Sequence, residues 1–338
     1  MTAPKVTEGT VAFNYPTLPK PCETWYKVYG DLSSASASSS PSARRPLVIL
    51  HGGPGLSHNY LLNLSRLAGD TATALVFYDQ VGSGQSTHLR EKRLDESFWT
   101  VELFMAELDN LLDHLGISSS FDLFGHSWGG MLGSQFAARG HAGLRKLVLG
   151  NAPASMPLFV ASCGSWRKQL PADVDDAISR HERDGTYEDP EYQAAVTEFY
   201  KRFVCRVFPF PGDFQDSIAW AEKDDTVYRT MNGPSEFTVT GNLRTWSVED
   251  QVHKITVPTL LLNADYDEVN DSIISNPKTR TGADIVVPGT AKKSCLYPFF
   301  NGIPKVKWYK FSDTSHCTNL EIPEKYCQVI ADFLLSSS

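Results

Sequence analysis

One serine lies in a short, glycine-flanked sequence that could carry acyl-transfer chemistry. Residues 125–130 read Gly-His-Ser-Trp-Gly-Gly and follow the apolar run at 121–124. A G-x-S-x-G sequence between a strand and a helix makes a turn so tight that the serine hydroxyl stands clear of the sheet. Because a hydroxyl in that position is suited to attack carbonyl carbons, we predict that Ser127 is a catalytic nucleophile.

A serine nucleophile needs an acid and a histidine, which in this arrangement follow it along the chain in that order. A strand is expected at 259–262, and Asp265, Asp267 and Glu268 come directly after it, so each of the three qualifies by position. His316 precedes the last expected helix, where its imidazole can take the serine proton while the acid holds the other ring nitrogen. The other histidines fit this role worse.

A second glycine-rich turn could stabilise the negative charge that develops on the substrate's carbonyl oxygen during the reaction. Residues 51–55 read His-Gly-Gly-Pro-Gly and follow the apolar run at 47–50. A loop at this place can supply one backbone N–H of an oxyanion hole, which we assign to Gly53, and the residue after the nucleophile, Trp128, supplies the other. Glycine lets the N–H point inward, and Pro54 stiffens the turn.

The elements that must position these residues alternate between short apolar runs and helical patterns. This alternation predicts an α/β protein with a mostly parallel sheet covered by helices on both faces, and with the serine turn it predicts the α/β-hydrolase fold. A helix is expected over 101–115 and another over 322–333, from apolar residues at helical spacing. Strands are expected at 24–30, 47–50, 74–78, 121–124, 146–149, 259–262 and 306–311.

The short apolar runs typical of strands are absent between residues 154 and 243, where aromatic residues instead recur at helical spacing. We predict a helical cap at 154–243 that lies over the strand ends, where α/β folds bind their ligands. The first part of the core is then 1–153 and the second part 244–338. The Ser/Ala/Pro-rich stretch 31–45 is expected to be a surface loop.

Composition excludes several classes of function. The chain of 338 residues carries 31 Lys and Arg against 39 Asp and Glu, a net charge of −8, so nucleic acid and anionic membranes are poor partners. No apolar run of 18 residues and no signal peptide is seen, and a cytoplasmic location is expected. The six cysteines form no C-x-x-C pair and are predicted to be free thiols rather than disulfides or a zinc site.

Taken together, the motifs resemble those of the proline iminopeptidases, including the tricorn-interacting aminopeptidases and the related L-amino-acid amidases. The resemblance covers nearly the whole chain. It is carried by the sequences at 51–55, 79–86 (Asp-Gln-x-Gly-x-Gly-x-Ser), 125–130, 187–193, 227–237, 240–246 and 257–260.

The resemblance implies particular roles. The family's Gly-x-Tyr-Asp-Glu motif falls on residues 264–268, which selects Asp267 as the triad acid and leaves Asp265 a solvated neighbour. The family binds the substrate's free α-amino group with acidic side chains, which fall on Glu236 and Glu268. Buried carboxylates hold an ammonium through charge-assisted hydrogen bonds, and an N-blocked substrate would leave them unpaired.

Two positions depart from the family pattern. Ala264 replaces the motif's glycine, a mild change. Asp267 and His316 are 49 positions apart, about twenty more than the resemblance leads us to expect, and the extra material lies near 271–295. Its composition predicts a surface excursion, which could also cover the entrance or contact a partner.

The expected reaction is therefore hydrolysis of short peptides or amino-acid amides through an acyl-enzyme, with no metal or organic cofactor. Alternatives remain open: an esterase or biosynthetic tailoring hydrolase that needs no substrate amine, an acyltransferase, or a non-catalytic binding protein of the same fold. Epoxide hydrolases and dehalogenases are excluded, because they need an aspartate in place of Ser127.

Overall fold

The structure, a computed structural model, describes residues 4–32, 44–271 and 294–336. Within these residues the strands form one eight-stranded sheet in the order β1-β2-β4-β3-β5-β6-β7-β8. β2 runs antiparallel to β1 and β4, and all other neighbours are parallel. The strands are β1 Val6–Phe13, β2 Cys22–Tyr29, β3 Leu47–Leu50, β4 Leu75–Tyr78, β5 Phe121–His126, β6 Leu144–Gly150, β7 Thr259–Ala264 and β8 Val306–Phe311.

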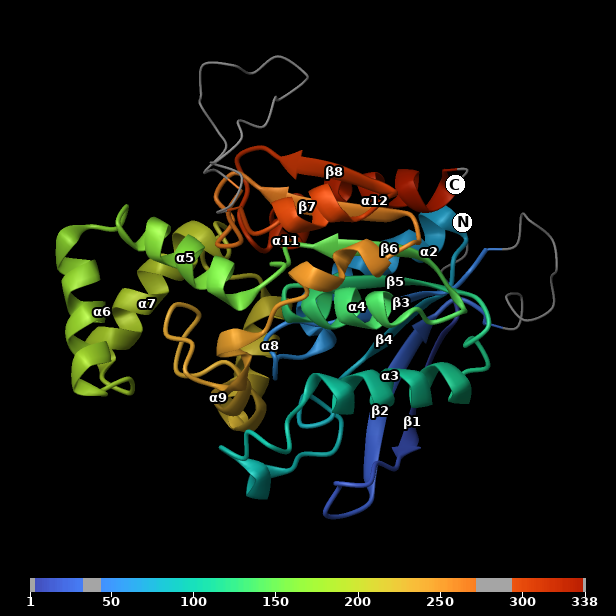
Figure 1. Ribbon diagram of the computed structural model, residues 1–338, viewed down its shortest axis with the longest axis horizontal. Helices are drawn as coiled ribbons and strands as arrows, with labels where there is room; N and C mark the ends of the chain where they lie inside the picture. Colours follow the sequence, from blue (N-terminus) through green and yellow to red (C-terminus); the bar gives the residue numbers. More distant parts are fainter. Residues whose placement is uncertain (1–3, 33–43, 272–293, 337–338) are drawn as a thin grey trace.

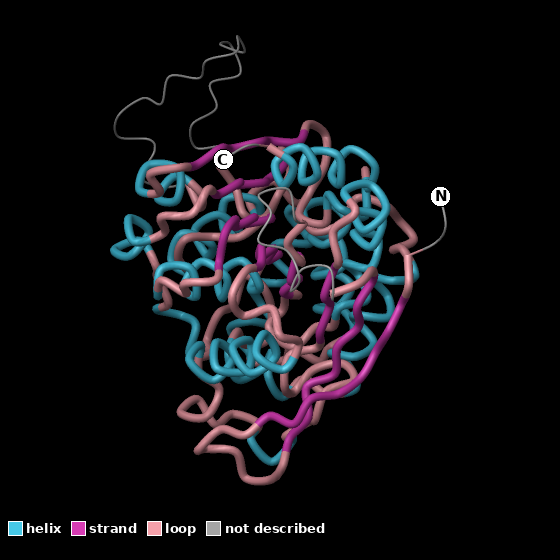
Figure 2. The backbone as a smooth tube through the Cα atoms, turned by 90° about the vertical axis from the view of Figure 1, so that its right-hand side faces the viewer, coloured by secondary structure: helices cyan, strands magenta, loops and turns pink. Residues whose placement is uncertain are grey.

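Helices cover both sides of this sheet, as Figure 2 shows, which confirms the predicted α/β-hydrolase architecture. β3, β4 and β5 are buried at every position, as expected for parallel strands that are covered on both faces. The helices are α2 Leu67–Thr71, α3 Val101–His114, α4 Trp128–Arg139, α5 Met156–Arg167, α6 Ala172–Asp184, α7 Pro190–Phe203, α8 Gly212–Lys223, α9 Thr226–Met231, α10 Tyr297–Gly302, α11 Thr318–Glu321 and α12 Pro323–Leu335.

The five helices α5–α9 come between β6 and β7 and gather at one end of the sheet (Figure 1). Local sequence fixes where several helices begin. The Asp189 side chain accepts a hydrogen bond of 2.8 Å from Glu191 N at the start of α7, with Pro190 in the first helical position. The Thr100 side chain accepts from Leu103 N at the start of α3.

β1 is a strand that the sequence patterns did not predict. It lies at the edge of the sheet, and most of its residues are exposed, so apolar and polar residues do not alternate clearly. Most of the predicted surface loop (33–43) and of the extra segment (272–293) falls outside the described residues.

Two further observations bear on the predicted class of protein. None of the helices in the described ranges has the length and apolar character needed to cross a membrane. All six cysteines are free and buried.

Candidate active site

Ser127 lies in a turn between β5 and α4 that only small neighbours allow. Its φ is +54°, and its N–H donates to the Gly150 carbonyl across 2.9 Å. A Cβ on Gly125 would lie 2.1 Å from the Gly129 carbonyl oxygen, and a Cβ on Gly129 would lie 2.3 Å from the Leu50 oxygen. Glycine at both positions therefore lets the turn close against β3 and leaves Ser127 partly exposed.

His316 and Asp267 meet although 49 positions separate them. His316 Nδ1 and Asp267 Oδ1 are 2.8 Å apart, and both side chains are buried. Asp267 also accepts from Asn151 Nδ2 (2.7 Å, at Oδ2) and from Val269 N (2.9 Å, at Oδ1). The carboxylate is thus held by three donors, which fixes its orientation toward the imidazole.

The structure separates the three acidic residues that qualified by position. Asp265 Oδ1 is 3.2 Å from Lys310 Nζ, and Asp265 Oδ2 accepts from Asp313 N at 3.1 Å, so this carboxylate faces the end of β8. Asp267 faces His316 Nδ1, and Glu268 Oε1 lies 3.5 Å from His316 Nε2.

Glu236 and Glu268 both line the cavity that contains Ser127 and His316. Tyr228 donates to Glu236 Oε1 across 2.8 Å, while Glu268 Oε2 is buried and has no hydrogen-bond partner among the described residues. Burial raises the pKa of Glu236 despite this hydrogen bond. Burial, with the neighbouring charges of Glu236 and Asp267, raises the pKa of Glu268 well above its ordinary value.

The carboxylates around His316 raise the pKa of its imidazole, whereas burial lowers it. Burial alone would lower its pKa, but the carboxylates of Glu268 and Asp267 outweigh burial and raise the pKa to about 9. His126, whose ring centroid lies 4.7 Å from that of His316, has a pKa well below its ordinary value because it is buried and faces His316. The two adjacent imidazoles therefore differ in protonation at neutral pH.

The glycine-rich loop after β3 is held beside the nucleophile by the 79–86 motif. Gln80 N donates to His51 Nε2 (3.0 Å), Gln80 Nε2 donates to the His51 carbonyl (3.1 Å), and Trp128 Nε1 donates to Gln80 Oε1 (2.8 Å). Gly53 has a φ of +113° and lines the cavity. No acceptor within the described ranges takes the backbone N–H of Gly53 or Trp128.

Two residues of this site, Tyr60 and His126, were not predicted from the sequence. Gly52 N donates to the Tyr60 hydroxyl (2.9 Å), which donates to His126 Nδ1 (2.9 Å), while His126 Nε2 donates to the His316 carbonyl (3.0 Å). This chain of hydrogen bonds links the glycine-rich loop to the backbone of His316. His126 offered a signal, because it lies inside the serine motif, whereas nothing local marks Tyr60.

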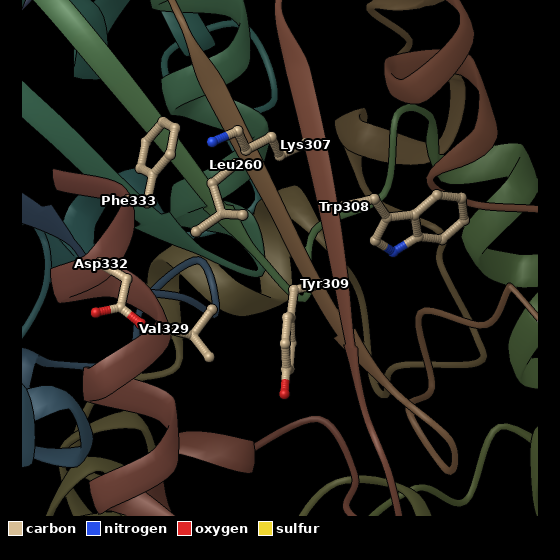
Figure 3. A pocket seen from close by; sticks show the side chains of 7 residues that line it. All are labelled: Leu260, Lys307, Trp308, Tyr309, Val329, Asp332 and Phe333. Carbon is tan, nitrogen blue, oxygen red and sulfur yellow. The ribbon is translucent and has the colours of Figure 1, made fainter. Parts of the chain in front are cut away.

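The cavity itself measures about 1160 Å³ and lies between the serine turn and the helices α7, α8 and α9. A smaller hollow of about 430 Å³ lies apart from it, between β8 and α12, with Lys307 and Asp332 among its lining residues (Figure 3). That hollow has no serine, histidine or cysteine in its lining. The chemistry-bearing residues therefore gather in the larger cavity.

Comparisons with known proteins agree with this arrangement. The model of the α/β-hydrolase fold family matches residues 45–321. Proline iminopeptidase of Thermoplasma volcanium is 35% identical over 75% of this chain and 83% of its own length. That of Saccharolobus solfataricus is 32% identical over 86% and 85%, respectively.

Two solved structures are similar to this chain over nearly its whole length. The crystal structure of VinJ has a TM-score of 0.82 and 42% identity, covering 96% of this chain and 98% of its own. That of proline iminopeptidase from Mycobacterium smegmatis has a TM-score of 0.78 and 40% identity, covering 96% and 97%. The fold and the site define a serine hydrolase of the α/β class. Within that class, the chain belongs to the proline iminopeptidase family.

Proposed function

We propose that this protein is a serine aminopeptidase that releases the N-terminal residue, proline in particular, from short peptides or amino-acid amides. The observation that supports it most is the composition of one cavity. The cavity contains Ser127, the His316 imidazole held by Asp267, and the two acidic side chains Glu236 and Glu268. Several relatives, including those from T. volcanium and S. solfataricus, carry the name proline iminopeptidase.

In the proposed reaction Ser127 Oγ attacks the carbonyl carbon of the substrate's first residue and gives its proton to His316 Nε2. Asp267 holds Nδ1 and stabilises the imidazolium. The N–H groups of Gly53 and Trp128 bind the oxyanion, a contribution of about 10²–10³ in rate for one donor. His316 returns the proton to the leaving amine, and water then releases the acyl group by the same steps in reverse.

We assign the recognition of the substrate's α-ammonium to Glu236 and Glu268. A buried carboxylate oxygen without a partner, such as Glu268 Oε2, favours a ligand that brings positive charge and hydrogen-bond donors. An N-acetylated substrate brings neither the charge nor enough donors. We therefore expect it to be rejected strongly.

We further propose that residues 154–243 act as a cap over the core formed by 1–153 and 244–338. Helices of this stretch, α7 and α8, contribute Tyr200 and Phe214 to the cavity lining. A cap at this place favours short substrates over folded proteins. The six free thiols support a reducing compartment, and we propose the cytoplasm.

The test is a panel of aminoacyl anilides, with proline and several other first residues, each compared with its N-acetylated form. We expect cleavage of free-amine substrates by the wild type and a loss on the order of 10⁶-fold in Ser127→Ala. Equal rates for free and acetylated substrates would indicate an esterase or a tailoring hydrolase that does not read the amine. No cleavage of any aminoacyl anilide by the wild type would contradict the proposal.

A further inference from the structure

Glu268 lies against the one ring nitrogen that the serine reaction needs. Asp267 occupies His316 Nδ1 at 2.8 Å, so Nε2 is the nitrogen left to accept the Ser127 proton. Glu268 Oε1 is 3.5 Å from that same Nε2, within ion-pair distance. Glu268 is 2% exposed, and its second oxygen has no partner in the described parts of the chain.

Without substrate, His316 is the one basic side chain within 4.0 Å of Glu268 in the described residues. A buried carboxylate is costly unless a cation or a proton neutralises it. The pKa of Glu268 lies well above its ordinary value through burial and nearby charge, and the carboxylates outweigh burial to raise the pKa of His316 to about 9. These shifts favour an ion pair between the Glu268 carboxylate and a protonated His316, in which Nε2 carries a proton and is not free to act as a base.

The other titratable groups around His316 do not favour loss of the proton on its Nε2. Asp267 and Glu236 add negative charge, which favours the protonated imidazole. His126 is engaged on both nitrogens, by Tyr60 and by the His316 carbonyl, and its pKa is lowered by burial. Burial raises the pKa of the Cys317 thiol well above its ordinary value, so this neighbour stays uncharged.

We propose that Glu268 is a substrate-operated gate on the catalytic base: it engages His316 Nε2 until the substrate's α-ammonium takes its place. This inference rests on the proposed aminopeptidase function and goes beyond it. The ammonium brings its own positive charge to Glu268, so the proton on Nε2 is no longer held and leaves to water in the cavity. His316 becomes a base only when a substrate with a free amine is bound, which couples amine recognition to chemistry rather than to binding alone.

The test uses a small fluorophosphonate that has no amine and reacts with activated serines. The Ser127 Oγ–P bond forms, fluoride leaves, and the hydroxyl proton passes to His316 Nε2, so the rate reports whether Nε2 is free. In the wild type we expect the inactivation rate to rise with pH, with a midpoint near pH 9. Adding methylammonium at pH 7 should accelerate inactivation at least about 10-fold, because only about 1% of an imidazole with that pKa is unprotonated at pH 7.

Glu268→Gln keeps the shape of the side chain and removes its charge. We expect its midpoint to fall by at least about one pH unit, its rate at pH 7 to rise about 10-fold, and methylammonium to lose its effect. The matched control is Glu188→Gln, which removes a carboxylate from the same cavity. The Glu188 side chain is 87% exposed and pairs with Arg229 rather than His316. Glu188→Gln should behave as the wild type does.

An unchanged midpoint in folded Glu268→Gln, while the wild type cleaves aminoacyl anilides, would overturn the gate and leave the proposed function standing. A lowered midpoint in Glu268→Gln, together with a wild type that cleaves no aminoacyl anilide, would instead remove the proposed function and the α-ammonium as the releasing ligand, while the hold of Glu268 on His316 Nε2 would stand.

A second measurement needs no variant. Calorimetric titration of wild-type protein with prolinol, an amino alcohol without a reactive carbonyl, in buffers of different ionisation enthalpy gives the number of protons released. We expect a value approaching one at pH 7.5, and binding without proton release would overturn the gate.

Discussion

Asn151 is one of the residues that orient the acid of the site, although it belongs to neither the serine turn nor the acid motif. It follows β6, has a φ of +52°, and donates from Nδ2 to Asp267 Oδ2 across 2.7 Å. Its side-chain oxygen accepts from the Tyr326 hydroxyl at 3.5 Å. Asn151 therefore joins the end of β6 to the loop after β7 through a single amide.

Asn151→Gly tests this contact, because glycine tolerates the positive φ and removes the whole side chain, including the amide that holds Asp267. A hydrogen bond to a charged group is worth about 1.5–3 kcal/mol, so kcat/KM on a good substrate should fall about 10- to 100-fold. The control is Leu94→Gly, because Leu94 also has a positive φ (64°) and its side chain is exposed. This substitution should change kcat/KM less than about twofold. Wild-type kcat/KM in Asn151→Gly would show that Asp267 needs no help from this amide.

Single residues were predictable from sequence where a motif fixes their place. Ser127 and His316 follow from the order of elements, because the carboxyl ends of parallel strands meet at one edge of the sheet. Asp265, Asp267 and Glu268 could not be separated by position, since one short loop carries all three. Their separation depends on Lys310 and on His316, whose contacts with that loop bridge 45 or more positions.

At the scale of elements, the strands that the sequence predicted best include both β3, which is buried at every position, and β8, which lies at the edge of the sheet and is mostly half-buried. β3 and β8 have the predicted bounds, and β4 begins one residue later than expected, at Leu75. β1 could not be predicted because an exposed edge strand carries no continuous apolar run. The contacts between elements were also invisible, since they depend on side chains that meet only after the sheet has formed.

Glu107 makes contacts of this kind between elements, and its burial makes the free energy of unfolding depend on pH. It lies on α3, is fully buried, and accepts from the Thr24 hydroxyl of β2 and from Val81 N after β4. Burial outweighs these hydrogen bonds and raises its pKa to about 8. The folded protein therefore keeps a proton that the unfolded chain loses above about pH 4.5, so this group's stabilisation declines as pH rises toward 8.

Glu107→Gln should remove that dependence. We expect the free energy of unfolding of the wild type to decline between pH 5 and pH 8 by a few kcal/mol more than that of the variant, measured by urea unfolding at several pH values. Glu102→Gln, an exposed carboxylate on the same helix, is the control and should follow the wild type. If the free energy of unfolding changes with pH in the same way in wild type and Glu107→Gln, the raised pKa of Glu107 would be contradicted.

The approach of α4 to β3 gives a second prediction at this scale. A Cβ on Gly129 would lie 2.3 Å from the Leu50 oxygen and 2.7 Å from the His51 oxygen, both backbone atoms that cannot turn away. Gly129→Ala should therefore lower the free energy of unfolding by about 1–3 kcal/mol, or more, and reduce activity by shifting the serine turn. Gly164→Ala in α5 meets nothing within 4 Å and should stabilise by about 0.5–1 kcal/mol. Equal effects of the two substitutions on urea unfolding would refute this reasoning.

At the scale of the whole molecule, the helices between β6 and β7, which we propose to act as a cap, also help to build the proposed active site. The Phe203 carbonyl, at the end of α7, accepts from Glu268 N (3.3 Å) and from His316 N (3.2 Å). Trp166 of α5 stacks on Phe203 with ring centroids 4.6 Å apart, and its Nε1 donates to the Asp267 carbonyl across 2.7 Å. The loops that bear the acid and the histidine are thus attached to α5 and α7.

Trp166→Phe tests whether this attachment matters for catalysis, because it keeps an aromatic ring beside Phe203 and removes the indole N–H together with the rest of the five-membered ring. The matched control is Trp246→Phe, whose Nε1 donates across 2.7 Å to Gln135 Oε1, on α4. Each variant loses one neutral hydrogen bond and part of its ring, so each should lose at least about 1 kcal/mol of stability in urea unfolding. Only Trp166→Phe should also lower kcat/KM, by about 10-fold, since a shift of the Asp267 loop misplaces the His316 imidazole. If both variants lose stability equally and keep full activity, the helices between β6 and β7 would cover the site without shaping it.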